Sequence, residues 1–308
     1  MNTPLRLGTR GSKLALTQTG LVRDALARAV PELAAPDAIE IVPIRTTGDA
    51  IQDRPLSEAG GKGLFVKEIE EALLSGRIDA AVHSMKDMPT AQPAGLVISA
   101  FLPREDARDV LIAGDARRIA DLRQGAIVGT SALRRRAQLL HRRPDLQIVN
   151  LRGNVDTRLA KRAAGIVEAT VLALAGLKRL GVADVGTPVP EDEMLPAVGQ
   201  GAVCIECRDD DARTRAWLAA IDHAPTATSV ATEHAMLVVL DGSCRTPIAG
   251  HAVLTGDGAL YLRGLIVKPD GSQLIATERR GAAGDAEALG RDAGHELKRR
   301  GGPGFLST

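Results

Sequence analysis

Aromatic residues are scarce in this chain of 308 residues: three Phe, one Tyr and one Trp make up 2% of it. Proteins that bind single-stranded nucleic acid stack bases on aromatic rings, so this scarcity argues against such a partner. The sequence also lacks an apolar run long enough to span a membrane, and it does not begin with a basic and then apolar leader. We therefore predict a soluble, cytoplasmic protein that binds neither nucleic acid nor a membrane.

Cysteine is also rare, and the odd number of residues, three, does not form a disulfide framework. This usage fits a reducing compartment. Cys204 and Cys207 match the C-x-x-C spacing, but they fall in an expected strand, where residues three apart point to opposite faces. A redox motif of this spacing begins a helix, and a zinc site needs a second ligand pair. We predict two packing residues and no metal, and we interpret His83, inside another expected strand, as a core residue.

The remaining composition is that of a globular protein, with 44% apolar and 25% charged residues. Strand-like and helix-like segments alternate in two successive regions, which is typical of βαβ units on parallel sheets. We expect a helix from Leu64 to about Leu74 in the first region, and we interpret Leu96 to Arg108 as a crossing into the second domain. The last region instead predicts a helix, three strands and a final helix, the pattern of a small α+β domain. We therefore predict three α/β or α+β domains: residues 1–102 with 200–220, residues 103–199, and residues 221–308.

Polar side chains follow the expected strands of the first domain, where each strand ends. Thr9, Arg10 and Ser12 come after the first strand, with Ser12 placed as the N-cap of the next helix; Thr46 and Asp49 come after the second, and Ser84, Lys86 and Asp87 after the third. Ligands of parallel sheets bind at these carboxyl ends, so we expect these side chains to converge on one cleft. Asp87 can stabilise a cation or move a proton there, or it can cap the turn before Pro89.

The net charge of +1 conceals an uneven distribution along the chain. Residues 117–162 contain twelve Lys and Arg against three acids, whereas residues 183–211 contain eight acids against one base. The first region predicts an anionic ligand. Nucleic acid is the rival ligand, although the acidic region nearby would oppose a polyanion.

Three arginines occupy positions that a helix disfavours. Arg134 and Arg135 lie in the first turn of an expected helix and Arg158 near the start of the next, where the helix dipole repels cations. We expect an anion to offset this repulsion, held also by free backbone N–H groups and by Thr130 and Ser131, which we expect to cap the helix. A solvent-exposed basic face is the alternative.

The third cysteine, Cys244, lies in a turn-rich loop between an expected helix that ends at Leu240 and a strand that follows Pro247. The neighbouring Arg245 can stabilise a thiolate, which is the form of cysteine that reacts covalently. A small residue packed into a tight corner is the other interpretation.

Eight motifs together resemble the porphobilinogen deaminase family, also called the hydroxymethylbilane synthases. Each motif is weak alone, but eight in the same order along the chain are specific. They are LGTRGS (7–12), GGKGLF (60–65), HSMKD (83–87), GTS with LRR (129–135), LRGN (151–154), AGLKRLG (175–181), LPAVGQG (195–201) and GSC (242–244). The departures, at Lys13, Glu168 and Cys204, touch none of the residues to which roles are carried over.

The resemblance implies two periplasmic-binding-protein-like βαβ domains with a cleft between them, plus a small α+β C-terminal domain. It implies a transferase of tetrapyrrole and haem biosynthesis that condenses four molecules of porphobilinogen head to tail into linear hydroxymethylbilane, with release of ammonia. Members of the family carry a dipyrromethane cofactor, itself made from two substrate units, in thioether linkage to a loop cysteine that matches Cys244. The resemblance also implies a monomer whose partner is the small-molecule substrate.

The resemblance also implies a role for each matched site residue. Asp87 is the catalytic residue, which holds pyrrole N–H groups and stabilises the positive charge that develops as ammonia leaves. The cofactor is expected to contact Cys244, Lys86, Asp87, Thr130, Ser131, Arg134, Arg135 and Arg158. The substrate is expected to contact Arg10, Ser12, Arg152, Arg158 and Arg179. Each pyrrole adds an acetate and a propionate, which accounts for the basic second domain.

Two other classes of function stay open on the sequence. A two-domain solute-binding protein shares the fold class and would bind a small anion without catalysis, although no signal peptide is evident. A nucleic-acid-binding protein would use the arginine-rich region and would bind DNA in a salt-dependent manner.

Overall fold

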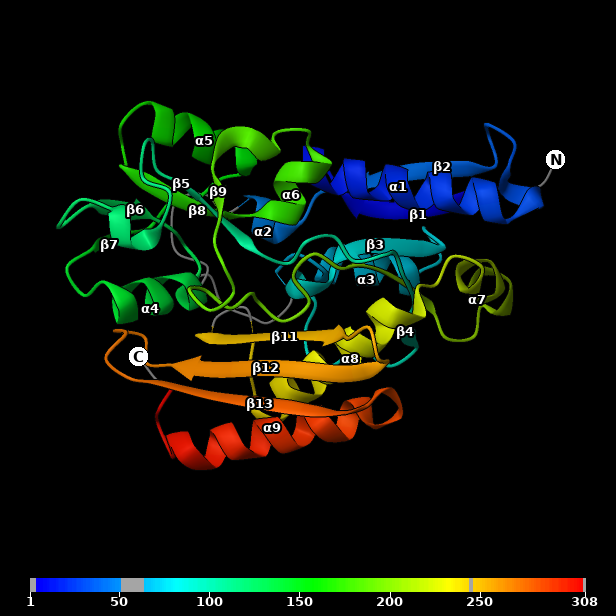
Figure 1. Ribbon diagram of the computed structural model, residues 1–308. Helices are drawn as coiled ribbons and strands as arrows, with labels where there is room; N and C mark the ends of the chain where they lie inside the picture. The colour runs from blue at the N-terminus through cyan, green and yellow to red at the C-terminus, as the bar shows by residue number, and fades with distance from the viewer. Residues whose placement is uncertain (1–3, 51–63, 244–245, 307–308) are drawn as a thin grey trace. The chain divides into compact units, whose positions relative to one another are not determined.

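A computed structural model describes residues 4–50, 64–243 and 246–306 (Figure 1). The chain forms two compact units: unit 1 is Met1–Arg104 with Ala202–Ala227, and unit 2 is Glu105–Gly201 with Thr228–Thr308. Within the described ranges, unit 1 contains one β-sheet and unit 2 contains two.

Unit 1 is built on a five-stranded sheet with the order β2-β1-β3-β10-β4. β1 pairs in parallel with β2 and β3, whereas β10 is antiparallel to both β3 and β4. The elements are β1 (Leu5–Arg10), α1 (Lys13–Ala29), η1 (Pro31–Leu33), β2 (Ile39–Ile44), α2 (Thr47–Ala50), α3 (Lys67–Leu74), β3 (Ala80–Ser84), η2 (Met85–Asp87), β4 (Leu96–Phe101), β10 (Val203–Arg208) and α7 (Ala212–Ala219).

The two faces of this sheet pack against different helices because successive strand residues point to opposite sides. On one face, Val82 and Ile205 form a hydrophobic core with Leu26 of α1. On the other face, Ala81 packs with Ile69 of α3. The turn between β3 and β4 therefore emerges from a strand that is covered on both sides.

The first sheet of unit 2 has the order β7-β6-β8-β5-β9. β6 is parallel to β7 and β8, and β5 is antiparallel to β8 and β9, so this sheet repeats the topology of unit 1. Its elements are β5 (Asp109–Ile112), η3 (Ile119–Asp121), β6 (Ile127–Gly129), α4 (Leu133–Arg142), β7 (Gln147–Val149), α5 (Val155–Ala163), β8 (Ala169–Ala173), α6 (Leu174–Arg179), η4 (Ala183–Val185) and β9 (Thr187–Pro188).

The second sheet of unit 2 is antiparallel, with the order β11-β12-β13, and α9 packs along it (Figure 1). Its core joins Met236 of α8, Leu262 of β12 and Leu297 of α9. The elements are α8 (Ala224–Val239), which begins in unit 1, β11 (Ile248–Leu254), β12 (Ala259–Val267), β13 (Leu274–Ala282), η5 (Ala283–Asp285) and α9 (Ala286–Gly301). The predicted fold class, two periplasmic-binding-protein-like βαβ domains and a small α+β C-terminal domain, is confirmed.

Two local predictions are wrong. Residues 96–101, interpreted as part of a crossing between domains, form strand β4 and pair with β10. That partner follows much later in the chain, so no local pattern reveals the pairing. The helix expected from Leu64 begins at Lys67, and Phe65 lies in the preceding turn, where its ring contacts Arg10 instead of a helical neighbour.

Candidate functional site

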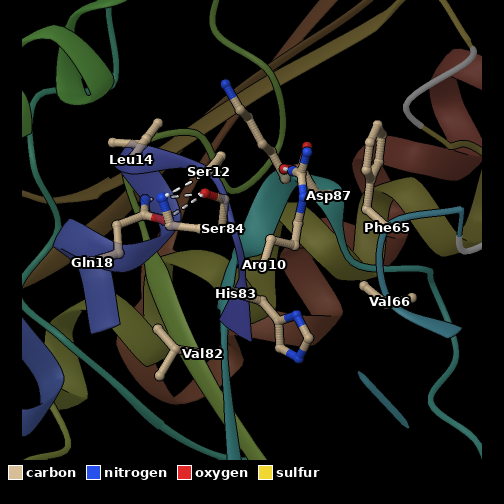
Figure 2. Close-up of a pocket in the computed structure, with 12 residues that line it drawn as sticks. Arg10, Ser12, Leu14, Gln18, Phe65, Val66, Val82, His83, Ser84 and Asp87 are labelled. Atoms are coloured by element: carbon tan, nitrogen blue, oxygen red, sulfur yellow. Dashed lines mark hydrogen bonds and ion pairs between the residues drawn. The ribbon is translucent and has the colours of Figure 1, made fainter. Parts of the chain in front are cut away.

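A pocket opens at the carboxyl ends of β1 and β3 in unit 1 (Figure 2). It encloses about 490 Å³ between atoms, part of it open to solvent. Arg10, Ser12, Ser84, Lys86 and Asp87 line it, as predicted from the strand ends. Thr9 and Thr46, also expected to converge there, are buried and are not among the lining residues, and the side chain of Asp49 lies outside the described residues. The other lining residues are Leu14, Ala15, Gln18, Phe65, Val66, Val82 and His83.

Arg10 forms an ion pair with Asp87 in this pocket. Its Nη1 lies 3.8 Å from Asp87 Oδ2, and the two side chains are 25% and 31% exposed. The guanidinium of Arg10 also lies over the ring of Phe65, 4.1 Å from its centroid. An ion pair of this length and exposure is weak, so an anionic ligand competes with Asp87 for Arg10.

The α1 side of the pocket is held by polar contacts. Ser12 Oγ accepts a hydrogen bond from the backbone N–H of Ala15 at 3.3 Å, which confirms its predicted role as the N-cap of α1. Gln18 Nε2 donates to Ser84 Oγ at 3.0 Å, as the dashed lines in Figure 2 show. The second turn of α1 is thereby attached to the end of β3, just before Lys86 and Asp87.

In unit 2, Arg134 and Arg135 are buried and share one carboxylate of this chain. Arg134 Nη2 lies 2.7 Å from Asp109 Oδ2, and Arg135 Nη2 lies 2.8 Å from Asp109 Oδ1. Arg134 also donates to the carbonyl of Leu195, and Arg135 to that of Val171. The anion that the helix-dipole argument requires at the start of α4 is therefore present in the protein itself, as Asp109.

Electrostatics within this cluster explain why it tolerates burial. Burial by itself would raise the pKa of Asp109, but the charges of Arg134 and Arg135 outweigh that effect and hold the pKa well below its usual range. Gln200 Nε2 adds a hydrogen bond to Asp109 Oδ1 at 2.9 Å. Asp109 thus connects β5, α4 and the loop 195–201, and its two arginines are each only 5% exposed.

The hydroxyl groups ahead of α4 do not cap it as expected. The N-cap is Ala132, which has no capping side chain, and α4 begins at Leu133. Thr130 Oγ1 accepts from the N–H of Ala132 at 3.2 Å, and Ser131 Oγ donates to the carbonyl of Leu151 at 2.6 Å. The prediction is wrong because both residues lie one or two positions too early for the helix.

The remaining predicted arginines are half-buried. Arg158 Nε donates to the carbonyl of Gly153 at 2.8 Å, and Arg179 Nη2 donates to that of Gly201 at 2.7 Å. Burial lowers the pKa of Arg179, against the charge of Glu105. Arg152 lies in the loop ahead of α5, where its carbonyl accepts from Lys161 Nζ at 3.1 Å.

Gly201 needs to be glycine. Its φ is +88°, and a Cβ atom there would stand 2.3 Å from the carbonyl oxygen of Glu105. Any other residue at position 201 would therefore distort the backbone whose carbonyl accepts the hydrogen bond from Arg179.

Cys244, Arg245 and the GGKG stretch at 60–63 lie outside the described residues. The loop before and after Cys244 is described: the N–H of Ser243 donates to Thr246 Oγ1 at 2.9 Å, and Thr246 Oγ1 donates to the carbonyl of Ser243 at 2.7 Å. Asp241 adopts a φ of +51° after α8 and pairs with Lys298 at 2.9 Å.

The other two cysteines are free and buried, so the prediction that they are packing residues is confirmed. Cys207 packs in the core on the α1 face, and its Sγ is 3.1 Å from Ser99 Oγ. Cys204 lies on the opposite face, where burial and the nearby charge of Glu206 raise the pKa of its thiol far above the usual range.

Among the residues that the structure describes, no three His, Cys, Asp or Glu side chains could hold a metal ion. In the same part of the chain, no helix is both long enough and apolar enough to cross a membrane.

Sequence reasoning missed several side chains of these two regions. Gln18 is 4% exposed although it is polar, and it falls four residues after Leu14 and four before Val22 on the apolar side of α1. Asp109 and Glu206 are both fully buried within strands. A polar residue at a position that the apolar pattern assigns to the core was the available signal.

Comparisons with known proteins agree along the chain. A family described as "Porphobilinogen deaminase, dipyromethane cofactor binding domain" matches residues 5–216, and "Porphobilinogen deaminase, C-terminal domain" matches residues 227–299. A porphobilinogen deaminase of Nitrobacter winogradskyi is 56% identical over 302 residues, which are 98% of this chain and 95% of that protein.

Two further relatives carry the same name. That of Paracoccus denitrificans is 58% identical over 298 residues, 96% of this chain and 94% of the relative. A chloroplastic porphobilinogen deaminase of Oryza sativa is 52% identical over 308 residues, 99% of this chain and 86% of the relative. The predicted cofactor, a dipyrromethane, is the one that the matched family domain binds. The chain therefore belongs to the porphobilinogen deaminase family of enzymes.

Proposed function

We propose that this chain is a transferase that joins four porphobilinogen molecules head to tail and yields linear hydroxymethylbilane. In each condensation the C–N bond of an aminomethyl group breaks, ammonia leaves, and a C–C bond forms to a pyrrole carbon, which then loses its proton. The observation that carries the proposal is the pocket in which Asp87 meets the cations Arg10 and Lys86.

Asp87 is the proposed catalytic residue because its charge suits the step that breaks the C–N bond. Departure of ammonia leaves positive charge on the pyrrole and its methylene carbon, and a fixed carboxylate next to that charge stabilises it. The same carboxylate accepts hydrogen bonds from pyrrole N–H groups. Asp87 is partly exposed and only loosely paired with Arg10, so it does not need to lose a strong internal contact first.

Arg10 and Lys86 are the proposed contacts for the acid side chains of the substrate in this pocket. Arg10 offers a planar fork that matches a carboxylate, whereas Lys86 acts as a point charge. Phe65 supports the guanidinium of Arg10 from one face, and Ser12 lines the same pocket. Substrate binding beside Asp87 therefore follows from the same residues that draw in its acetate and propionate groups.

The side chains present fit a dipyrromethane, since a pocket with two cations and one carboxylate matches a ligand with acidic side chains and N–H donors. We propose that it is held in thioether linkage by Cys244 and contacted by Lys86, Asp87, Thr130, Ser131 and Arg158. When bound, it supplies the free pyrrole carbon to which the first substrate is joined. Cys204 and Cys207 are both buried, which supports Cys244 as the attachment residue.

The unit 2 arginines divide into two groups in this proposal. Arg152, Arg158 and Arg179 bind substrate carboxylates. Arg134 and Arg135, predicted as cofactor contacts, act on the ligand mainly by fixing the first turn of α4, because Asp109 already occupies both guanidinium groups.

We also propose the three-domain division at residues 1–102 with 200–220, 103–199 and 221–308, and a cytoplasmic monomer. The free thiols of Cys204 and Cys207 suit a reducing compartment, and the bacterial relatives carry no organelle in their names, unlike the chloroplastic one.

Intact-protein mass spectrometry after incubation with porphobilinogen tests the proposal. The wild type should carry the added mass of two pyrrole units and should release hydroxymethylbilane. Cys244→Ser should carry no added mass, whereas the matched control Cys207→Ser should carry it. Unmodified wild-type protein without product would overturn the proposal.

A further inference from the structure

A second group of titratable side chains lies on the α3 face of the unit 1 sheet. Glu70 comes from α3, His83 from β3 and Glu206 from β10, and they are 9%, 5% and 0% exposed. His83 also lines the pocket of Figure 2. The function proposed above uses none of the three.

Strand register explains why they meet. Glu206 lies opposite Ala81 and Cys204 opposite His83 in the antiparallel pair of β3 and β10. Glu206 and His83 are therefore diagonal neighbours on one face of the sheet, and His83 Nε2 is 3.3 Å from Glu206 Oε2. Ala81 of the same face packs against α3, the helix that carries Glu70.

The hydrogen-bond capacity of this group is not used. The 3.3 Å contact between His83 Nε2 and Glu206 Oε2 lacks the angles of a hydrogen bond, so both atoms, together with Glu206 Oε1 and Glu70 Oε1, are buried without a hydrogen-bond partner among the described residues. Burial of net charge without such partners is costly. The group has zero net charge in either of two forms: both carboxyl groups are protonated beside a neutral imidazole, or one carboxyl group is protonated beside a carboxylate and an imidazolium. In each form at least one carboxyl group carries a proton.

Glu70 is the better candidate for that proton. Burial raises the pKa of Glu70, the negative charge of Glu206 raises it further, and His83 acts in the opposite direction. The strands packed against α3 bring few other charges. They are Arg6, which pairs with Asp79, and Arg10 on β1, the exposed Glu40 on β2, and the Cys204 thiol and Arg208, which pairs with Asp211, on β10; β4 has none. On α3 itself, Lys67 and Glu71 pair with each other at the surface, and Glu68 accepts from Thr47.

The same interior connects this group with the pocket. The pKa of Cys204 is raised by burial, then by Glu206, and to a smaller degree by Asp87. His83 lines the pocket, and its Nε2 lies 3.3 Å from Glu206 Oε2, so a change of charge in the group acts close to the pocket.

We propose that Glu70, His83 and Glu206 form a buried proton-sharing cluster, and that loss of its proton weakens binding of the anionic substrate in the adjoining pocket. The identity of that substrate rests on the proposed function. The three residues are positioning residues, since they act through the charge beneath the pocket rather than on the reacting atoms.

The first test is the pH dependence of KM and kcat for porphobilinogen. In the wild type, one added negative charge should raise KM roughly three- to tenfold as the pH rises and the cluster loses its proton. Glu70→Gln cannot ionise and should keep the low KM, with kcat changed less than about twofold. The control Glu71→Gln, exposed on the same helix, should behave as the wild type. An identical KM profile in Glu70→Gln and the wild type would refute the proposal.

The second test reads the proton itself and does not depend on turnover. In protein with ¹³C-labelled glutamate carboxyl groups, one signal should titrate above the ordinary glutamate pKa of about 4.3. That signal should be missing in Glu70→Gln and present in Glu71→Gln. If the wild type lacks this signal, the proton-sharing cluster is refuted. If the signal is present but the protein does not turn over porphobilinogen, only the proposed function is refuted.

Discussion

Arginine and aspartate meet in both units of this protein, with opposite consequences. In the pocket of unit 1, Arg10 and Asp87 are a quarter to a third exposed and 3.8 Å apart. In unit 2, Arg134 and Arg135 are buried and each lies within 2.8 Å of Asp109. Water weakens the attraction between Arg10 and Asp87, so a ligand can replace either residue as the partner of the other. The buried charges of the second group lack water, so each needs its counter-ion. Burial, rather than residue type, decides which charges are open to a substrate.

Asp109→Asn should have the largest effect on folding, because it leaves two buried guanidinium groups without a counter-ion. We expect the free energy of unfolding to fall by about 3–5 kcal/mol in urea denaturation. The matched change at an exposed pair, Asp24→Asn beside Arg23, should alter it little. Equal stability of the two variants would show that the buried cluster is not structural.

Asp87→Asn should have the largest effect on catalysis while leaving folding intact. The amide keeps the shape of the carboxylate but removes its charge, so kcat should fall roughly 100- to 1000-fold in steady-state assays of hydroxymethylbilane formation. The urea midpoint should change little, because the pair with Arg10 is long and exposed. Near-normal turnover by this variant would remove Asp87 from its proposed role.

Glu70→Gln should change how stability depends on pH. The native state holds a proton on Glu70 that the unfolded chain has already lost, because the native pKa is raised. Wild-type stability should therefore fall as the pH rises from the ordinary glutamate value through the raised one, by about 1.4 kcal/mol for each unit of difference. Chemical denaturation across this pH range should show that the free energy of unfolding falls in the wild type and not in Glu70→Gln. The same pH dependence in both proteins would contradict a raised pKa of Glu70.

Phe65→Leu should have the smallest effect. It removes the ring beneath the Arg10 guanidinium, which contributes about 0.5–1 kcal/mol at a partly exposed site. We expect a roughly two- to fivefold rise in KM for porphobilinogen, with kcat and the melting temperature nearly unchanged. A large loss of kcat instead would mean that the ring contacts the reacting part of the substrate.

Features set by neighbouring residues were predictable. Ser12 caps α1 as expected because the capping oxygen and the N–H groups it serves are only three residues apart. The alternation along β10 correctly separated Cys204 from Cys207, since strand geometry alone assigns their faces. Arg10 and Asp87 could be brought together because parallel strands end at one edge of a sheet.

Features set by distant residues were not. The position of Arg134 and Arg135 in the first turn of a helix indicates an anion nearby. The counter-ion, Asp109, lies 25 and 26 residues earlier in the chain, so local sequence does not identify it. The strand at 96–101 likewise pairs with β10, which follows much later in the chain, and Phe65, ahead of α3, contacts the distant Arg10.

The sequence by itself determined the family, the two alternating βαβ regions and the strand ends that carry Arg10 and Asp87, because local periodicity and motif order encode them. Only the tertiary structure decided which charges line the open pocket and which are buried against each other. The physical reason is that the energy of a charge depends on its solvation and its nearest counter-charge, and both are set by residues far away in the chain.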